Sequence, residues 1–384
     1  MTERLYYQDC YLREFAARVV ETADEGRRVY LDRTAFYPTS GGQPFDVGTL
    51  AGITVREVID EEDRIAHILD APLPAAEVDG AIDWNRRYDH MQQHTGQHLL
   101  SAVLEELFAI RTVSFHLGSE VSTIDVEAAT LTAEQLERVE DRCAEIVAEA
   151  RPIQITFEDA ASDLELRKAS ARTGILRIVS IEGVDRSACG GTHVRTASEI
   201  GMVLTGKLEK IRGITRIEFV CGKRALRRAQ SDNRLVASIG RALSVPPEQT
   251  PELLAALIEK NKALEKTGQR LATELARREG HDLYAATPPG TDGIRFAAQR
   301  GPIDDAMRTR AQAFVAGAKS VFLAVCDPPP SLLLAASVDS GVHAGERIKA
   351  AVTAAGGRGG GNQQLGQGSV PDAAALAQAE ALLR

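Results

Sequence analysis

Two pairs of residues, each four positions apart, carry side chains that bind metal ions. His94 and His98 stand in HTGQHLL, at the head of an apolar run typical of a helix, so both imidazoles can face one ion. Cys189 and His193 stand in CGGTHV, where two glycines allow a tight loop. Together the pairs offer three imidazole nitrogens and one thiolate sulfur, a set that suits zinc, with copper as a chemical competitor.

The residues between and before the two helical histidines limit the kinds of metal site that fit this sequence. A zinc protease needs HExxH, and residues 95–97 are Thr-Gly-Gln, without a carboxylate. His90 lies one turn earlier, where we expect the helix to start, and we interpret it as a cap or a supporting group instead of a fifth ligand. Four protein ligands usually mean structural zinc, so catalysis would require a ligand that gives way to water, five-coordination, or neighbours that position the water.

The elements that must position these residues change along the chain. Residues 1–85 hold short strand-like runs and predict a β-barrel or β-sandwich. Residues 86–222 mix two helical patterns with strands and predict an α+β unit on an antiparallel sheet. Residues 223–280 predict a helical connector, and residues 281–384 alternate strand and helix in a C-terminal α/β domain. The sequence therefore predicts a multidomain α+β protein.

Within the connector, seven residues recur in steps of three and four over about three heptads, namely Leu254, Leu257, Asn261, Leu264, Gly268, Leu271 and Leu275. Packing against the chain's own helices explains this seam as well as a partner does. A homodimer through the connector or the C-terminal domain is one prediction.

Composition limits the partners and the compartment. The net charge is -9, but residues 207–241 hold ten Lys/Arg against three acidic residues, a local net of +7 that fits a solvated helix face or an RNA contact. The five cysteines are scattered without a CxxC pair, which argues against disulfides. We find neither a signal peptide nor a membrane span, and we expect a cytoplasmic protein with no membrane partner.

Several motifs together resemble a known family. YPTSGGQPFDVG (37–48), HTGQHLL (94–100), SFHLG (114–118) with TIDVE (123–127), and CGGTHV (189–194) look like the editing region of alanyl-tRNA synthetase, and like the long form of the free-standing AlaX editing proteins. The editing fold is shared with threonyl-tRNA synthetase. GGRGGGNQQLGQGS (356–369) similarly resembles the DHH-associated C-terminal domain of alanyl-tRNA synthetase, although NQQLGQGSV departs from the usual pattern.

The resemblance implies a function and roles for particular residues. It implies one zinc ion per chain on the four residues above, and hydrolysis of tRNA(Ala) mischarged with serine, with glycine as a second candidate. We expect Gln97 and Gln43 to supply hydrogen bonds to the water and the aminoacyl group, and Thr39 to bind the seryl hydroxyl. Without the family, PTSGGQP fits a turn that binds nothing. His116 could approach the terminal adenosine or be an ordinary strand residue.

Three rival functions remain open on the sequence. A non-catalytic tRNA-binding module with structural zinc would share the metal and the partner. Editing of another aminoacyl-tRNA is the second, and a DHH-type phosphoesterase the third, although Asp89-His90-Met91 is not the DHH triplet. GGRGGG lacks the Lys-Ser/Thr of a P-loop and fits a flexible loop as well as a backbone contact to phosphate.

Overall fold

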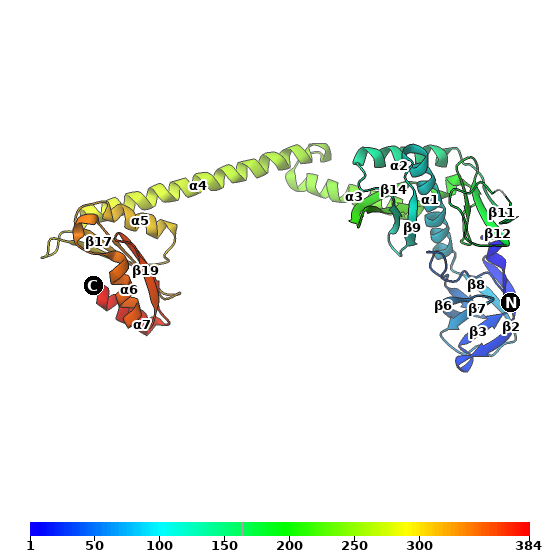
Figure 1. Ribbon diagram of the computed structural model, residues 1–384, viewed down its shortest axis with the longest axis horizontal. Coiled ribbons are helices and arrows are strands. Elements are labelled where there is room, and N and C mark those ends of the chain that lie inside the picture. Colours follow the sequence, from blue (N-terminus) through cyan, green and yellow to red (C-terminus); the bar gives the residue numbers. More distant parts are fainter. Residues whose placement is uncertain (163) are drawn as a thin grey trace. The chain divides into compact units, whose positions relative to one another are not determined.

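A computed structural model describes residues 1–162 and 164–384 of the chain. These residues form two compact units, Met1–Ile239 and Gly240–Arg384, and Figure 1 labels many of their elements. Both units combine helices with β-structure, as the sequence predicted: unit 1 holds several separate sheets, and unit 2 holds one. The four segments expected from the sequence divide the chain more finely, and their boundaries stay a prediction.

The first part of unit 1 is a closed six-stranded barrel, the first of the two alternatives that the strand-like runs allowed. Alternate residues of its strands point inward, as Val78, Gly80 and Ile82 do in one of them. In barrel order the strands are β2 (Glu14–Ala23), β3 (Arg28–Leu31), β7 (Arg64–Leu69), β6 (Ile53–Glu61), β5 (Gly48–Leu50) and β8 (Glu77–Ile82). Strands β1 (Glu3–Arg4) and β4 (Arg33–Thr34) form a separate parallel pair.

Helix α1 (Trp84–Phe108) leaves the barrel directly and carries the first ligand pair (Figure 1). Its N-cap is Asp83, which accepts a hydrogen bond from the backbone of Arg86. The expectation that the helix starts near His90 is therefore wrong, because that residue is already buried inside it. Further on, the helix packs so closely on the strand bearing Cys221 that a Cβ on Gly96 would lie 2.1 Å from its Sγ.

Two antiparallel sheets and a second helix surround α1. Helix α2 (Ala133–Ala148) begins with a capping box formed by Thr132 and Gln135. The four-stranded sheet has the order β14 (Val203–Ile211), β15 (Ile214–Cys221), β10 (Ser122–Val126), β9 (Thr112–Leu117), and the three-stranded sheet has the order β11 (Ile153–Asp159), β12 (Ile175–Ile181), β13 (Asp185–Ala188). Helix α1 contacts β9, β13 and β15, so residues distant in sequence meet at its buried face.

Two long helices follow, α3 (Gly222–Leu243) and α4 (Thr250–Ala286). The predicted seam lies on α4, and its five leucines are 40 to 60% exposed. Helix α4 is covered at its first residue, Thr250, and in its later part, where Ala276 and Gly280 are buried and the helix packs on α5 (Asp305–Val315). Within the described residues of unit 2, the other helices therefore do not cover the seam. No helix of residues 1–162 and 164–384 combines the length and apolarity needed to cross a membrane.

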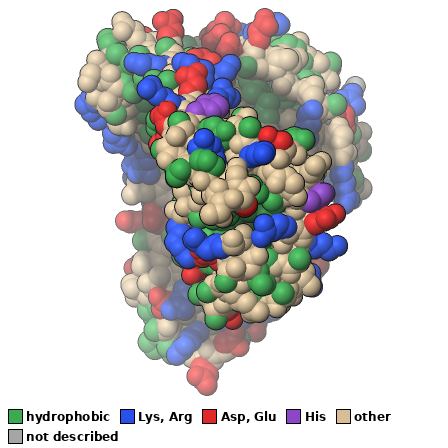
Figure 2. Space-filling model, turned by 90° about the vertical axis from the view of Figure 1, so that its left-hand side faces the viewer, with side chains coloured by type: hydrophobic (Ala, Val, Ile, Leu, Met, Phe, Trp, Pro, Cys, Tyr) green, Lys and Arg blue, Asp and Glu red, His purple; other side chains and the backbone are tan. Residues whose placement is uncertain are grey.

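Unit 2 is built on a five-stranded sheet whose strands β17 (Ser320–Cys326) and β18 (Ser331–Ala336) are buried on both faces. Val321, Leu323 and Val325 belong to one apolar cluster, and Phe322 and Ala324 to the other, as alternation in a strand requires. The order is β16 (Arg295–Arg300), β17, β18, β20 (Leu365–Ser369), β19 (Arg358–Gly361), with helices α6 (Ala344–Ala354) and α7 (Ala373–Leu383). On the face drawn in Figure 2, basic and acidic side chains are interspersed.

The glycine-rich segment of unit 2 is not the flexible loop that the sequence allowed. Residues 358–361 and 366–369 pair as an antiparallel hairpin, and β20 also pairs with β18. Helix α6 packs on both strands of the hairpin. Strand β19 lies at the edge of the sheet and pairs on one side only, so contact of its other side with phosphate stays a prediction.

A buried ion pair fastens α1 to the barrel and its loops. The Arg87 guanidinium has no exposed surface and donates from Nε to Asp46 Oδ2 at 3.0 Å. It also donates to the carbonyl oxygens of Cys10 at 2.8 Å and Ala35 at 2.6 Å. Asp46 in turn accepts the backbone N–H of Tyr37 at 2.7 Å. One side chain therefore fixes the loop 37–46 and the N-terminal segment against the helix.

We expect Arg87→Ala to lower the free energy of unfolding by about 3–5 kcal/mol, because Asp46 would stay buried without a cation. Urea unfolding followed by circular dichroism measures the loss. Arg56→Ala is the matched control, since Arg56 pairs with Asp70 at the surface and its side chain is 71% exposed. That variant should lose less than about 1 kcal/mol; equal losses in the two variants would contradict the anchoring role.

Candidate metal centre

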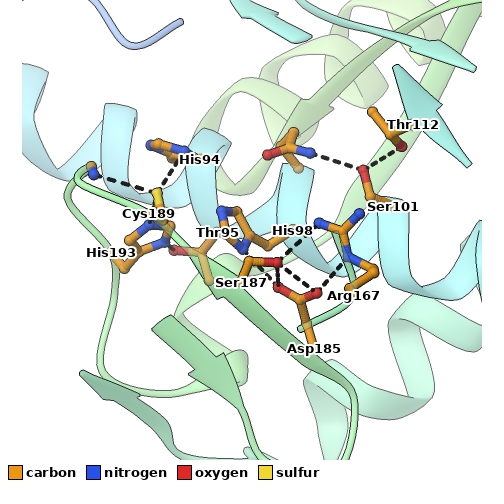
Figure 3. A network of polar contacts seen from close by, with 12 residues as sticks. His94, Thr95, His98, Ser101, Thr112, Arg167, Asp185, Ser187, Cys189 and His193 are labelled. Carbon is orange, nitrogen blue, oxygen red and sulfur yellow. Dashed lines mark hydrogen bonds and ion pairs between the residues drawn. The ribbon is translucent and has the colours of Figure 1, made fainter. Parts of the chain in front are cut away.

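The four residues predicted as metal ligands lie together. His94 and His98 come from α1, and Cys189 and His193 from the loop after β13 (Figure 3). Their donor atoms all lie within 4.8 Å of one another. Cys189 Sγ is 3.5 Å from His94 Nε2 and 3.3 Å from His193 Nε2. In tetrahedral zinc sites a sulfur and a nitrogen ligand lie about 3.5 Å apart, given the usual bond lengths. The spacing therefore fits zinc.

Two of the imidazoles are oriented by uncharged oxygens. Gln43 Oε1 accepts from His94 Nδ1 at 2.8 Å. Thr95 Oγ1 lies 3.1 Å from His193 Nδ1 and gives its own proton to the carbonyl oxygen of Met91, so it accepts from the histidine. A histidine that donates from Nδ1 presents an unprotonated Nε2, which is the form that binds a metal.

The third imidazole is oriented by a carboxylate. Asp185 Oδ2 accepts from His98 Nδ1 at 2.7 Å, and its Oδ1 accepts from Arg167 Nε at 2.5 Å. The Ser187 hydroxyl lies 3.1 and 3.0 Å from the two oxygens. Burial raises the pKa of Asp185, but the contacts with His98 and Arg167 outweigh it and bring the pKa to about 2. The carboxylate is therefore ionised.

The charges of the site favour a thiolate. Burial raises the pKa of the Cys189 thiol, but the contacts with His94 and His193 lower it by more. The pKa of this thiol therefore lies well below its usual range. Burial lowers the pKa of His98, whereas Asp185 and Cys189 raise it to about 9, so His98 loses a proton when a metal binds. The donor set is then one thiolate and three neutral imidazoles, which is a zinc-binding set.

The loop that carries Cys189 and His193 is held by its backbone. A Cβ on Gly191 would lie 2.2 Å from His94 Cε1, so only glycine fits there. The buried Arg177 donates to the carbonyl oxygens of Cys189 at 2.7 Å and Gly191 at 2.9 Å. The glycines expected to allow a tight loop thus allow a close approach to the helix.

A cavity of about 620 Å³ opens beside these ligands. Gln97 lines it, as expected for a residue near the reacting groups, and its amide donates to Ser101 Oγ at 2.8 Å. The Thr112 hydroxyl donates to the same oxygen at 2.7 Å. Much of the remaining wall comes from the loop before Gln43, strand β9 and the connection between β11 and β12, including Tyr37, Ser40, Gly41, Val113, Ser114, Phe115, Arg167, Lys168, Ser170, Arg172 and Thr173.

The other residues singled out in the sequence lie apart from the cavity wall. Gln43 is fully buried behind His94, and Thr39 is exposed, with its hydroxyl accepting the N–H of Phe45 at 3.3 Å. His116 is exposed on β9 opposite Thr123.

His90 is buried, and its Nδ1 has no hydrogen-bond partner among residues 1–162 and 164–384. The sequence did not point to Asp185, Arg167 or Arg177. Thr95 could have been noticed, because it stands inside the histidine motif.

We expect the purified protein to hold one zinc ion per chain, and Cys189→Ser to lower the zinc content more than tenfold, because the thiolate carries the only negative charge among the four ligands. Elemental analysis after dialysis against a weak chelator measures the content. His116→Ala serves as the control, since that histidine lies outside the cluster. Zinc lost equally from both variants would refute the ligand assignment.

Residues 176–218 match the family model described as "Threonyl and Alanyl tRNA synthetase second additional domain". That segment includes Asp185, Cys189 and His193. The chain is also similar to the alanyl-tRNA editing protein AlaX-L of Pyrococcus horikoshii, at 35% identity over 73% of this chain and 71% of that protein.

Two further relatives match almost the whole chain. The alanyl-tRNA editing protein Aarsd1 of Mus musculus is 29% identical over 99% of this chain and 97% of its own length. The alanine–tRNA ligase of Pyrococcus abyssi is 30% identical over 97% of this chain but only 42% of its own length. On this identity and coverage, the chain belongs to the family of alanyl-tRNA editing proteins.

Proposed function

We propose that the chain is a zinc-dependent hydrolase that acts in trans on tRNA(Ala) charged with the wrong amino acid, above all serine, with glycine as a second substrate. Membership of the editing family supports the partner and the general reaction. The observation that carries the proposal is the convergence of four oriented donor atoms on the edge of a cavity large enough for an aminoacylated ribose.

The ester to be cleaved is already activated, so the site has to place a water molecule and stabilise negative charge on the carbonyl oxygen. A zinc ion on His94, His98, Cys189 and His193 supplies a Lewis acid beside the cavity. Gln97 reaches the cavity, and its amide is steadied by Ser101, so we assign it the hydrogen bond to the aminoacyl group or the water.

Gln43 has a different part in this proposal from the direct contact expected from the sequence. Its Oε1 accepts from His94 and from the Thr192 N–H at 3.1 Å, and its Nε2 donates to Thr192 Oγ1 at 2.8 Å. Both ends of the amide are therefore occupied. We assign Gln43 to holding His94 and the ligand loop in place, away from the substrate.

The basic stretch 207–241 supports contact with the tRNA only in part. Arg216 and Arg224 form ion pairs with Asp125 and Asp89, which neutralise part of the positive charge of this stretch. Lys207, Lys210 and Arg212 are exposed at the hairpin between β14 and β15, and they supply the positive charge that an acceptor stem would require. The homodimer, for which the exposed seam of α4 is one candidate surface, and the cytoplasmic location stay predictions.

In a deacylation assay the wild-type chain should release serine from Ser-tRNA(Ala) at least a hundredfold faster than alanine from Ala-tRNA(Ala). Cys189→Ala should lose this activity because the metal site is incomplete. Circular dichroism and tRNA retention on a filter serve as controls for folding and binding.

Zinc and tRNA binding without turnover would favour the non-catalytic module instead. Turnover of another mischarged tRNA in preference to tRNA(Ala) would favour the second rival.

A second assay separates two candidates for the contact with the seryl hydroxyl. Thr39 was expected from the sequence, whereas Ser40, its neighbour, lines the cavity and is half-buried there. We expect Ser40→Ala to reduce the preference for Ser-tRNA(Ala) over Ala-tRNA(Ala) about tenfold, the value of one hydrogen bond. Thr39→Val should change it less. The reverse order would assign the contact to Thr39.

A further inference from the structure

Arg167 lies on the cavity wall and also contacts the carboxylate that orients His98. We propose that Arg167 is a positioning residue of the metal centre, which acts on His98 through Asp185. This inference rests on the metal site of the proposed function. It assigns a role to a side chain that is neither a ligand nor one of the residues expected from the sequence.

Both ends of Arg167 are fixed. Its backbone N–H donates to the carbonyl oxygen of Arg186 at 2.9 Å. Its guanidinium donates from Nε to Asp185 Oδ1 at 2.5 Å and from Nη2 to Ser187 Oγ at 3.3 Å. The side chain is only 15% exposed. Arg167 is therefore part of the ordered wall of the site instead of a mobile surface cation.

The carboxylate of Asp185 needs this partner. Its side chain has no exposed surface, so water cannot compensate its charge or fix its plane. His98 occupies Oδ2, and without Arg167 the other oxygen would keep only the Ser187 hydroxyl. A planar guanidinium fixes the plane of a carboxylate, which in turn fixes the direction of the imidazole. Loss of Arg167 should therefore loosen His98 without removing it.

The position of Arg167 in the chain links the metal to the substrate. It lies in the connection between β11 and β12, whose residues Lys168, Ser170, Arg172 and Thr173 also line the cavity. The same segment thus shapes the cavity and holds the partner of a ligand. This connection therefore influences both the direction of the His98 imidazole and the shape of the cavity wall.

The test measures metal binding directly and needs no tRNA. Zinc affinity is determined by competition with a chelating dye, and cobalt substitution reports the coordination geometry through its visible spectrum. We expect Arg167→Ala to lower zinc affinity about tenfold and to change the cobalt bands, and Arg167→Lys to restore part of the affinity. Unchanged affinity and bands in Arg167→Ala would overturn the proposal, and if that variant does not fold, wild-type values in Arg167→Lys would overturn it.

Two further variants test whether Arg167 acts through Asp185. Asp185→Asn should lower zinc affinity by about ten- to a hundredfold, and adding Arg167→Ala to it should cause no further loss. Additive losses would overturn the route through Asp185. Arg186→Ala is the matched control, because Arg186 is the next residue on β13 but pairs with Glu158. A wild-type chain that binds zinc but hydrolyses no mischarged tRNA would refute the proposed function and leave this inference standing.

Discussion

Each imidazole of the metal centre has one nitrogen bonded to a protein oxygen, and this constraint makes the cluster a binding site. A histidine side chain can rotate and can carry its proton on either nitrogen, so proximity alone does not create a ligand. Here Gln43, Thr95 and Asp185 each occupy an Nδ1 atom, which leaves three Nε2 atoms turned toward the Cys189 sulfur. Contacts within the chain itself therefore orient the three imidazoles.

The three oxygens come from three parts of the fold, and this explains why so much structure surrounds a small site. Gln43 belongs to the loop that follows the first barrel strands, Thr95 to α1, and Asp185 to β13. The barrel can present Gln43 only because Arg87 and Asp46 fix its loop to the helix. The metal centre therefore lies where the barrel, the helix and the three-stranded sheet meet.

The ligands could be predicted from the sequence, because both pairs lie within five residues of chain and helical spacing or a short loop determines their geometry. Asp185 and Arg167 could not, since their meeting with His98 depends on how β13 packs against α1, and no local pattern encodes that contact. The sequence also could not show which of Thr39 and Ser40 lines the cavity, because this depends on the conformation of the turn that holds both residues. The segment GGRGGG (356–361) resembled a loop because glycine does not show the alternation by which strands are recognised.

Gly96 has a meaning beyond its place in the histidine motif. A methyl group there would overlap the sulfur of Cys221. Glycine is therefore required at this position because α1 lies close to β15, and not because of the chemistry of the metal. The motif HTGQH thus combines two requirements, one for ligands and one for the close packing of a helix on a sheet. Transfer of the histidines alone to another scaffold would carry the ligands without the packing that sets their depth, so the motif is portable only together with its strand.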